Sequence, residues 1–362
     1  MRTLFMLFAT MALVSCGSVG DKPTPKDMLV SRLSSFTSSG RIAYGHQDDI
    51  VYGHNWKVED WENDPLERSD VKDVAGKYPA VLGFDLGGIE LGDSCNLDGV
   101  PFGLIRKASL KHIERGGIVT YSWHPRNIVT GNDAWDVSTS GVVTACLEGG
   151  CRQEEFALWL QRAADFIESL GADVPVIFRP WHENLGGWFW WGKDLCSAQE
   201  YIALFRQTRS YFDGRGLGNI VWCYSPNGNA GADGFMSRYP GDDYVDMLGI
   251  DTYEGLYGGI GIEQGAENYR TEVKANLTYL SALAKEHGKL MCFAETGLEG
   301  LPDPAWWTES LYPSIKDFPI AYVLTWRNAH DKPGHFYAPW KDFENSENFK
   351  DFCEKEQIVL LD

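Results

Sequence analysis

The 362-residue sequence lacks several features that would point to common classes of protein. It has no CxxC pair and no histidine-rich tract, so we expect neither a metal nor another cofactor. It shows no internal repeat, coiled coil or low-complexity stretch, which argues against a repeat or fibrous architecture. Basic residues are few, because 32 Lys and Arg stand against 51 Asp and Glu, and the net charge is −19. Nucleic acids and anionic polysaccharides are therefore poor partners, and a neutral ligand fits better.

The sequence also lacks an apolar run long enough to span a bilayer, since Leu4 to Val14 is too short for that. Preceded by Arg2, this run is typical of a targeting segment. It ends in Leu13-Val14-Ser15-Cys16, which resembles the lipobox of bacterial lipoproteins. The resemblance implies a signal peptide over residues 1–15, a lipid on Cys16 and a short tether over residues 16–25. We expect export and anchoring to the bacterial outer membrane, on its periplasmic face or at the cell surface. An ordinary secretory signal is the alternative.

Seven cysteines follow Cys16, and an odd number leaves at least one of them free or paired between molecules. Cys223 and Cys292 lie in apolar, strand-like runs and are predicted to be small core residues. The predicted loops contain four others: Cys95, Cys146, Cys151 and Cys196. A Cys146–Cys151 bridge is one candidate, and the connectivity stays open.

Eight strand-like runs alternate with helical patterns along the chain. The runs are continuous rather than alternating in hydrophobicity, which is typical of parallel strands covered on both faces. They are Arg41–Gly45, Ala80–Asp85, Ile118–Trp123, Val174–Arg179, Ile220–Tyr224, Val245–Asp251, Leu290–Glu295 and Ala321–Trp326. The clearest helical stretches are Lys26–Ser38, Gln153–Leu170, Ala198–Phe212 and Asn268–His287. We predict an α/β fold, a single-domain (β/α)8 TIM barrel over residues 26–362. A doubly wound sheet is the alternative, but the first strand lacks a glycine-rich phosphate turn after it.

The stretch from Val174 to Trp191 combines a buried strand with a polar and aromatic loop. The strand leads into Arg179-Pro180-Trp181-His182-Glu183, and two glycines and four aromatics follow. A carboxyl group among apolar neighbours tends to keep its proton and can act as a general acid. Aromatic faces stack on sugar rings, and the chain has 14 Trp and 16 Tyr. This pattern favours a sugar-cleaving site, although a polar strand end beside core tryptophans would look similar.

Polar or aromatic residues follow most of the predicted strands. In a barrel all these strand ends share one rim, where such enzymes have their active sites. The rim residues are His46 and Gln47, Asp85, His124, Glu183, Asp251 and Tyr253, Glu295, and Trp326 and Arg327. Glu183 and Glu295, after the fourth and seventh strands, form a pair of carboxylates suited to a retaining glycosidase.

Several motifs together resemble glycoside hydrolase family 26, the β-mannanase family. They are Arg179-Pro180-Trp181-His182-Glu183, Gly187-Trp188, Ile250-Asp251-Thr252-Tyr253, Ala294-Glu295-Thr296-Gly297 and Thr325-Trp326-Arg327-Asn328. The resemblance extends from Gly45-His46-Gln47 over nearly the whole mature chain. It implies that Glu183 is the acid/base and Glu295 the nucleophile of a retaining mechanism.

The resemblance also implies roles for other residues. Tyr253 is expected to donate its hydroxyl to Glu295, and His182 to lie near the −1 sugar or to orient the nucleophile. A rim tyrosine and a core histidine are the alternatives. The remaining predicted substrate-binding residues are His46, His124, Trp188, Asp251, Trp326 and Arg327. Core packing competes for Trp181, Trp190 and Trp191, which we leave out of the predicted site.

We predict cleavage of β-1,4-mannosidic bonds in mannan, galactomannan or manno-oligosaccharides by a monomeric enzyme. Mannose has an axial 2-hydroxyl, so polar groups close to the −1 ring should select it, and His124, His182 and Asp251 are placed for this. Long connections after the first and last strands, His46 to Tyr78 and Asn328 to Asp342, favour a cleft closed behind the second sugar, and therefore release of mannobiose. The same loops could line an open, endo-acting cleft.

Other functions fit parts of the same pattern. Within the family, β-1,3-1,4-glucanase or β-1,3-xylanase activity is the nearest alternative. A lipid-anchored, non-catalytic glycan-binding protein would be expected to lack one of the two glutamates, and both are present. A metal-dependent hydrolase using His46, His124 and His182 usually opens with His-x-His, whereas this chain has His46-Gln47-Asp48. Endo or exo action and tolerance of galactose branches stay open.

Overall fold

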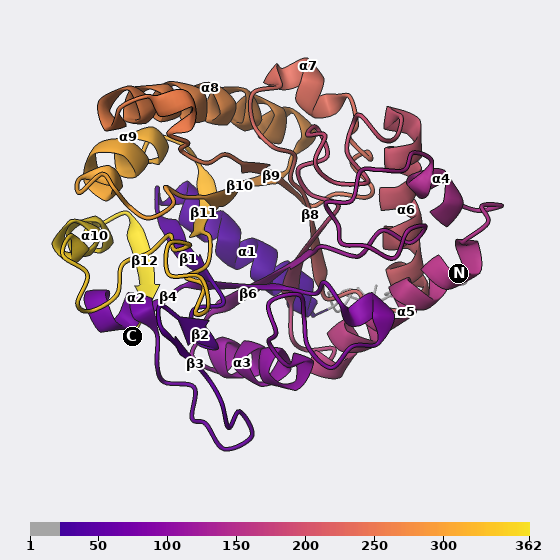
Figure 1. The fold of residues 1–362 in the computed structure, drawn as a ribbon, viewed down its shortest axis with the longest axis horizontal. Coiled ribbons are helices and arrows are strands. Elements are labelled where there is room, and N and C mark those ends of the chain that lie inside the picture. Colours follow the sequence, from indigo (N-terminus) through magenta and orange to yellow (C-terminus); the bar gives the residue numbers. More distant parts are fainter. Residues whose placement is uncertain (1–21) are drawn as a thin grey trace, which may run out of the picture.

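The computed structural model of the protein describes residues 22–362, and its core is a closed barrel of eight parallel strands (Figure 1). Each strand pairs with the next one along the chain, and the last pairs with the first to close the ring. The barrel strands are β1 (Ile42–Gln47), β5 (Val81–Asp85), β6 (Ile118–Trp123), β7 (Val176–Pro180), β8 (Ile220–Tyr224), β9 (Met247–Asp251), β10 (Leu290–Thr296) and β11 (Ile320–Thr325).

The predicted (β/α)8 barrel is therefore confirmed, with strand ends shifted by a few residues. Apart from Leu290, every residue of the barrel strands is buried. Along each strand, side chains point alternately into the barrel and toward the helices, so both faces of the strand are apolar. This explains why the strands read as continuous rather than alternating apolar runs.

An outer ring of helices covers the barrel (Figure 1). Helix α5 has the predicted bounds, and α6 begins at a capping box in which Ser197 and Glu200 bond each other's backbone amides. Helix α8 begins at Ile262, earlier than predicted. The prediction missed its first turns because they contain Gly265 and few apolar residues. The helices are α2 (Asp70–Ala75), η1 (Ile89–Leu91), α3 (Phe102–Glu114), α4 (Val142–Cys146), α5 (Gln153–Leu170), α6 (Ala198–Gly214), α7 (Gly231–Met236), η2 (Tyr257–Gly259), α8 (Ile262–His287), η3 (Trp306–Leu311), α9 (Tyr312–Ile315) and α10 (Ser346–Cys353).

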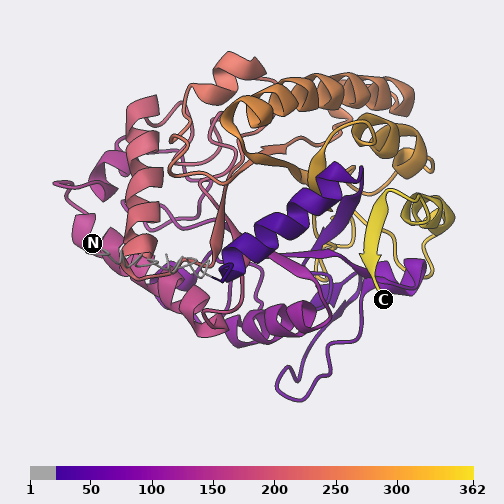
Figure 2. The same cartoon turned by 180° about the vertical axis from the view of Figure 1, so that it is seen from behind.

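Helix α1 (Pro25–Ser38) crosses the end of the barrel where the strands begin (Figure 2). It contacts β1, β8, β10 and β11, and it buries Leu29, Leu33 and Phe36. Its N-terminus is capped by Thr24, whose hydroxyl accepts from the Asp27 amide. With this end covered, the opposite rim is the open end of the barrel.

Four short strands extend the fold outside the barrel. β12 (Ile358–Leu361) pairs in parallel with β1, and β4 (Tyr78–Pro79) pairs antiparallel with β12. β2 (Tyr52–Gly53) and β3 (Trp56–Lys57) form a hairpin in the long loop after β1.

The two long rim loops pack against each other. The Asp70 carboxylate accepts from the Trp56 indole at 2.7 Å and from the Asn328 amide at 2.9 Å, and His54 stacks on Trp340. The length of the first loop favoured a wall behind the second sugar, but Asp48, Asp49, Tyr52 and Trp56 of this loop are buried and do not form one. Their polar groups bond mainly within the first loop, where Tyr52 donates to Asp48 and Ser69 donates to Asp49.

The seven cysteines among residues 22–362 are free thiols, so the candidate Cys146–Cys151 bridge is not formed. Cys223 and Cys292 are buried as predicted, whereas Cys146 ends α4 instead of lying in a loop. The predicted signal peptide and Cys16 lie outside the described residues. Within the described part of the chain, no helix combines the length and the apolar character that a membrane span needs.

Candidate active site

The chain makes a strained turn where β7 ends and Glu183 enters the rim. Trp181 and Glu183 have left-handed backbones, with φ of 56° and 52°. Such a backbone costs about 1–3 kcal/mol and is found mainly at functional sites. Trp181 is fully buried, and its indole donates to the Thr208 hydroxyl at 3.1 Å. The buried tryptophan anchors the turn that directs Glu183 into the barrel opening.

The surroundings of Glu183 favour its protonated form. Burial and the nearby Glu295 carboxylate raise the pKa of Glu183 to about 7. The Trp188 indole donates to Glu183 Oε2 at 2.7 Å, which orients the carboxyl group and partly offsets the rise in pKa. A carboxyl group with this pKa can both give and accept a proton near neutral pH.

Glu295, at the end of β10, is surrounded by hydrogen-bond donors. Arg179 Nη2 donates to Glu295 Oε1, and the Tyr253 hydroxyl donates to Oε2 at 2.7 Å. Burial and the Glu295 charge raise the pKa of Tyr253 well above its ordinary value, so the hydroxyl keeps its proton. A cation and a hydroxyl therefore compensate the charge of Glu295 and fix its orientation.

Arg179 connects Glu295 to Asp251, at the end of β9. Arg179 Nη1 donates to Asp251 Oδ2 at 2.8 Å, and the Ser225 hydroxyl donates to Oδ1 at 2.7 Å. Burial alone would lower the pKa of Arg179, but Asp251 and Glu295 raise it well above the ordinary value. The guanidinium is thus a permanent positive charge beneath the site, and Asp251 fixes its position through their ion pair.

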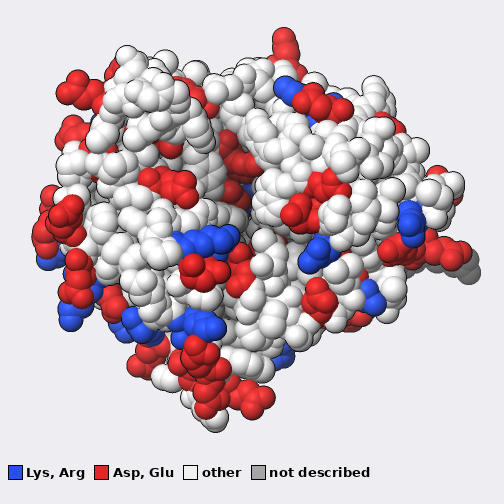
Figure 3. Space-filling view, in the orientation of Figure 1, with Lys and Arg blue, Asp and Glu red and all other residues white. Residues whose placement is uncertain are grey.

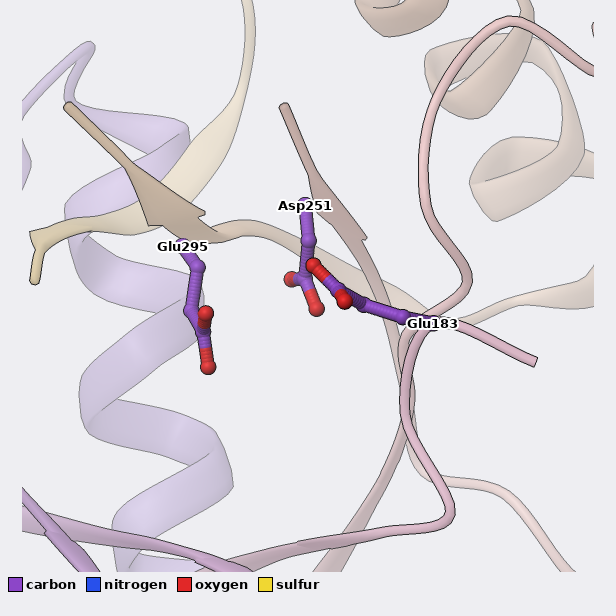
Figure 4. Close-up of side chains that lie close together, drawn as sticks. All are labelled: Glu183, Asp251 and Glu295. Carbon is purple, nitrogen blue, oxygen red and sulfur yellow. The ribbon is translucent and has the colours of Figure 1, made fainter. Parts of the chain in front are cut away.

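The three carboxyl groups lie close together (Figure 4). One oxygen each from Glu183, Asp251 and Glu295 lie within 4.8 Å of one another, which would be close enough to share a metal ion. Arg179 already pairs with two of them, so a protein cation takes the place that a metal would fill. Among residues 22–362, His46, His124 and His182 do not form a metal-binding group.

A chain of hydrogen bonds fixes two histidines beside the carboxyl groups. Asp85 Oδ2 lies 2.6 Å from His124 Nδ1, and His124 Nε2 lies 3.0 Å from His182 Nε2. Burial alone would lower the pKa of His124, but the Asp85 carboxylate raises it. Burial, Arg179 and His124 lower the pKa of His182 well below its ordinary value. His124 is therefore the donor to a neutral His182, whose proton is on Nδ1.

The site lies in a cleft with three connected parts, and acidic side chains show in the hollow at the middle of this face (Figure 3). The central chamber has a volume of about 470 Å3 and contains both glutamates. Its other walls include His124, Trp135, His182, Phe189, Tyr253, Trp326, His335 and Tyr337.

On one side the chamber opens into a smaller cavity of about 290 Å3, which we call the Arg327 pocket. It is lined by Asp85, Leu97, Asp98, Arg327 and Lys332, and it shares His124, Trp135, Trp326 and His335 with the chamber. Arg327 Nη2 forms an ion pair with Asp98 at 2.9 Å, and both side chains are buried.

On the other side lies a cavity of about 370 Å3, which we call the Tyr257 groove. It shares Glu183, Tyr253 and Tyr257 with the chamber. Its own lining residues are Trp188, Asn227, Gly228, Asn229, Asp251, Thr252 and Glu272.

The structure brings nearly all of the predicted site residues into this cleft. Glu183, Glu295, His124, His182, Tyr253 and Trp326 line the chamber, Arg327 lines its own pocket, and Trp188 and Asp251 line the Tyr257 groove. His46 is the exception: it is fully buried, lines none of these cavities and bonds Asp49 at 2.7 Å. Its predicted substrate contact is corrected to a structural role, because the imidazole is buried against Asp49. Trp181, Trp190 and Trp191 are fully buried, as core packing required.

Sequence reasoning missed the roles of several cleft residues. Arg179 belongs to the quoted motif, and an arginine inside a buried strand was itself a signal of a carboxylate partner. Asp98, Trp135, Tyr257 and Glu272 lie in loops or on a helix surface, where the pattern of neighbours gives no such signal.

A (β/α)8 barrel whose rim pairs a proton-holding carboxyl group with an arginine-bound carboxylate defines a glycoside hydrolase. The chain belongs to glycosyl hydrolase family 26, whose model matches residues 39–293, so the family predicted from the motifs is confirmed.

Known relatives agree with this assignment. A family 26 β-mannanase structure from Bacteroides ovatus is 40% identical, with a TM-score of 0.86, covering 94% of this chain and 96% of that one. The catalytic domain of an endo-β-1,4-mannanase from Bacillus sp. JAMB-750 is 31% identical, with a TM-score of 0.82, covering 93% and 92%. A mannan endo-1,4-β-mannosidase of Bifidobacterium adolescentis is 31% identical over 86% of this chain and 33% of its own length. A mannan endo-1,4-β-mannosidase of Bacillus subtilis is 30% identical over 52% of this chain and 54% of its own length. The chain thus spans a third to about half of these two curated relatives.

Proposed function

We propose that this chain hydrolyses β-1,4-mannosidic bonds with retention of anomeric configuration, using Glu183 as acid/base and Glu295 as nucleophile. The observation that carries the proposal is the contrast between the two carboxyl groups. Glu183 has a pKa raised to about 7, whereas Glu295 is bound to the Arg179 cation and the Tyr253 hydroxyl. One oxygen of each lies within 4.8 Å of the other, which agrees with the short separation of a retaining pair.

In the first step Glu295 attacks the anomeric carbon, and the bond to the leaving sugar breaks. Glu183 gives its proton to the departing oxygen, and the sugar stays bound to Glu295 as an ester. In the second step Glu183 takes a proton from water, and the resulting oxygen displaces Glu295 from the same carbon. Two inversions restore the starting configuration and both carboxyl groups.

The preference for mannose is assigned to the histidine pair. His124 and His182 line the chamber beside both glutamates, whereas Asp251 is already bonded to Arg179 and Ser225. His182 Nδ1 is buried and has no hydrogen-bond partner among the residues that the structure describes, which makes it the uncommitted donor of this pair. The predicted contribution of Asp251 to mannose recognition is therefore transferred to the support of Arg179.

Product profiles on linear mannan, galactomannan and mixed-linkage β-glucan test the substrate. We expect hydrolysis of mannan to be fastest, with β-configured products first seen by NMR. Faster hydrolysis of β-glucan would favour the alternative glucanase activity. One relative supports this alternative, because an endoglucanase H of Acetivibrio thermocellus is 26% identical over 38% of this chain.

Release of mannobiose is part of the proposal. The far end of the Arg327 pocket is built from the Asp98–Arg327 ion pair, Leu97 and Lys332, which leaves a small volume beyond the chamber. Two long loops were predicted to close this end. The loop after β11 lines the pocket with Lys332 and His335, whereas the loop after β1 only supports it, since the Tyr52 hydroxyl accepts from Arg327 and donates to Asp48. Timed digestion of mannohexaose tests the closure. Mannobiose alone at the earliest times supports it, and a spread of early products contradicts it.

We also propose that Cys16 carries a lipid that anchors the protein to the outer membrane. The support is the sequence Leu13-Val14-Ser15-Cys16 after an apolar run. Wild-type protein should partition with membranes, whereas Cys16→Ala should be uncleaved or found in the soluble fraction. Wild-type protein free in the periplasm would leave only the secretory signal.

A further inference from the structure

Tyr257 is the most exposed of the large aromatic and aliphatic side chains that line the cleft. Its side chain is 83% exposed, yet it borders both the central chamber and the Tyr257 groove. It lies on a glycine-rich segment, in which Gly258 and Gly259 have left-handed backbones. A Cβ on Gly255 would collide with the tyrosine ring, so this glycine leaves the ring its place beside the cleft. Trp188, which is 43% exposed, borders the same groove.

The floor of the groove is polar and is held open. Asn227 Oδ1 is buried without a hydrogen-bond partner, and Glu272, on helix α8, also lines the groove. A Cβ on Gly228 would meet the side chains of Asn276 and Thr252, with Glu272 Oε1 at 3.2 Å, so only glycine leaves this space free. Asn276 accepts from the Asn229 amide at 3.2 Å and donates to Thr252 at 3.2 Å, which fixes the floor.

The position of the groove relative to Glu183 identifies its side of the cleft. Glu183 borders the chamber and the groove, but it does not border the Arg327 pocket. A general acid lies on the side of the leaving group, because it protonates the oxygen that departs. The groove therefore faces the leaving part of the glycan, and the Arg327 pocket faces the part that becomes bound to Glu295.

We propose that the Tyr257 groove binds the leaving portion of the glycan, with Tyr257 as the stacking platform and Glu272 as the hydrogen-bond acceptor for the second leaving sugar. This inference rests on the proposed function and extends it to residues outside the predicted site. Trp188 is bonded to Glu183 and is close to the first leaving sugar. Tyr257 lies where the chamber meets the groove, and Glu272 lines the groove but not the chamber. Exposed rings above a floor of amide and carboxylate oxygens match the apolar faces and the hydroxyls of pyranose rings.

The test compares mannotetraose, mannotriose and 4-nitrophenyl β-mannobioside. Bound by two sugars on the Arg327 side, mannotetraose places two sugars in the leaving portion, mannotriose one and the aryl substrate none. Tyr257→Ala should lower kcat/KM for mannotetraose about tenfold, equivalent to about 1.4 kcal/mol. It should leave the aryl substrate unchanged and reduce the mannotetraose-to-mannotriose ratio. Glu272→Ala should act in the same direction, and Tyr257→Phe should retain the wild-type ratio.

Leu158→Ala is the matched control, because Leu158 is 42% exposed on α5 and lines none of the three parts of the cleft. It should leave all three rates unchanged. Equal losses on all three substrates for Tyr257→Ala, or an unchanged ratio, would overturn the inference. A wild-type enzyme that hydrolyses none of the three would instead overturn the proposed function.

Discussion

The ends of β7 and β10 present the same side chain in opposite settings. At the end of β7, Glu183 lies on a strained turn with one neutral donor, the Trp188 indole, and its pKa is raised to about 7 by burial and by Glu295. At the end of β10, Glu295 lies within the strand, where the pairing with β9 shifts register, and it accepts from a guanidinium and a phenol. The difference shows that the neighbours, rather than the residue type, assign one carboxyl group to proton transfer and the other to attack.

Removal of the carboxylate at the end of β10 should have the largest effect. Glu295→Ala cannot form the covalent intermediate, so we expect a loss of kcat on the order of 10⁴-fold or more on every substrate, including activated aryl mannobiosides. The measurement is steady-state turnover on mannan and on the aryl substrate. Added azide should yield an α-configured azide product, because it attacks from the face that Glu295 left. A β-azide would reverse our assignment of the two roles.

Removal of the carboxyl group at the end of β7 should have a large but substrate-dependent effect. Glu183→Ala should reduce kcat/KM on mannan about 10²–10⁴-fold, the usual contribution of a general acid. Dinitrophenyl mannobioside needs little protonation, so the first step on this substrate should survive as a burst of released phenol. With azide present, the product should have the β-configuration. Equal losses on mannan and on the dinitrophenyl substrate would contradict the acid role.

Weakening the donors around Glu295 should have an intermediate effect. Tyr253→Phe removes one hydrogen bond to a charged group, and such bonds contribute about 1.5–3 kcal/mol, so kcat should fall roughly 10–100-fold. Burst kinetics on the aryl substrate should locate the loss in formation of the covalent intermediate. A change in KM alone would instead make Tyr253 a substrate contact.

The smallest expected effect is on the pH profile. Glu183 must be protonated to act as an acid, so kcat/KM should fall as the pH rises through about 7, the pKa of this group. The Trp188 hydrogen bond lowers that pKa, so Trp188→Phe should move the alkaline limb to higher pH by less than about one unit. Hydrolysis of the mannobioside between pH 5 and 9 measures the alkaline limb of the wild type and of Trp188→Phe. A limb that moves to lower pH, or that persists in Glu183→Ala on the dinitrophenyl substrate, would assign it to another group.

Residues that follow strands were predictable, because parallel strands of a barrel all end at one rim. This rule placed Glu183, Glu295, His124, Tyr253, Trp326 and Arg327 correctly around one cleft. It failed for His46, which also ends a strand but is fully buried beside Asp49. A strand end fixes the location of the backbone, but the rotamer and the neighbouring loop decide which way the side chain faces.

The sequence by itself determined the barrel, the two glutamates and the family, because these depend on local hydrophobic patterns and on short motifs. Only the tertiary structure decided which charged and hydrogen-bonding groups contact each carboxyl group. Arg179 and Glu295 are 116 residues apart, Asp85 and His124 are 39 apart, and Asn229 and Asn276 are 47 apart. Glu272 reaches the cleft only because α8 packs against β9 and β10. Charge compensation and pKa depend on distances between such remote groups, and closure of the barrel sets those distances.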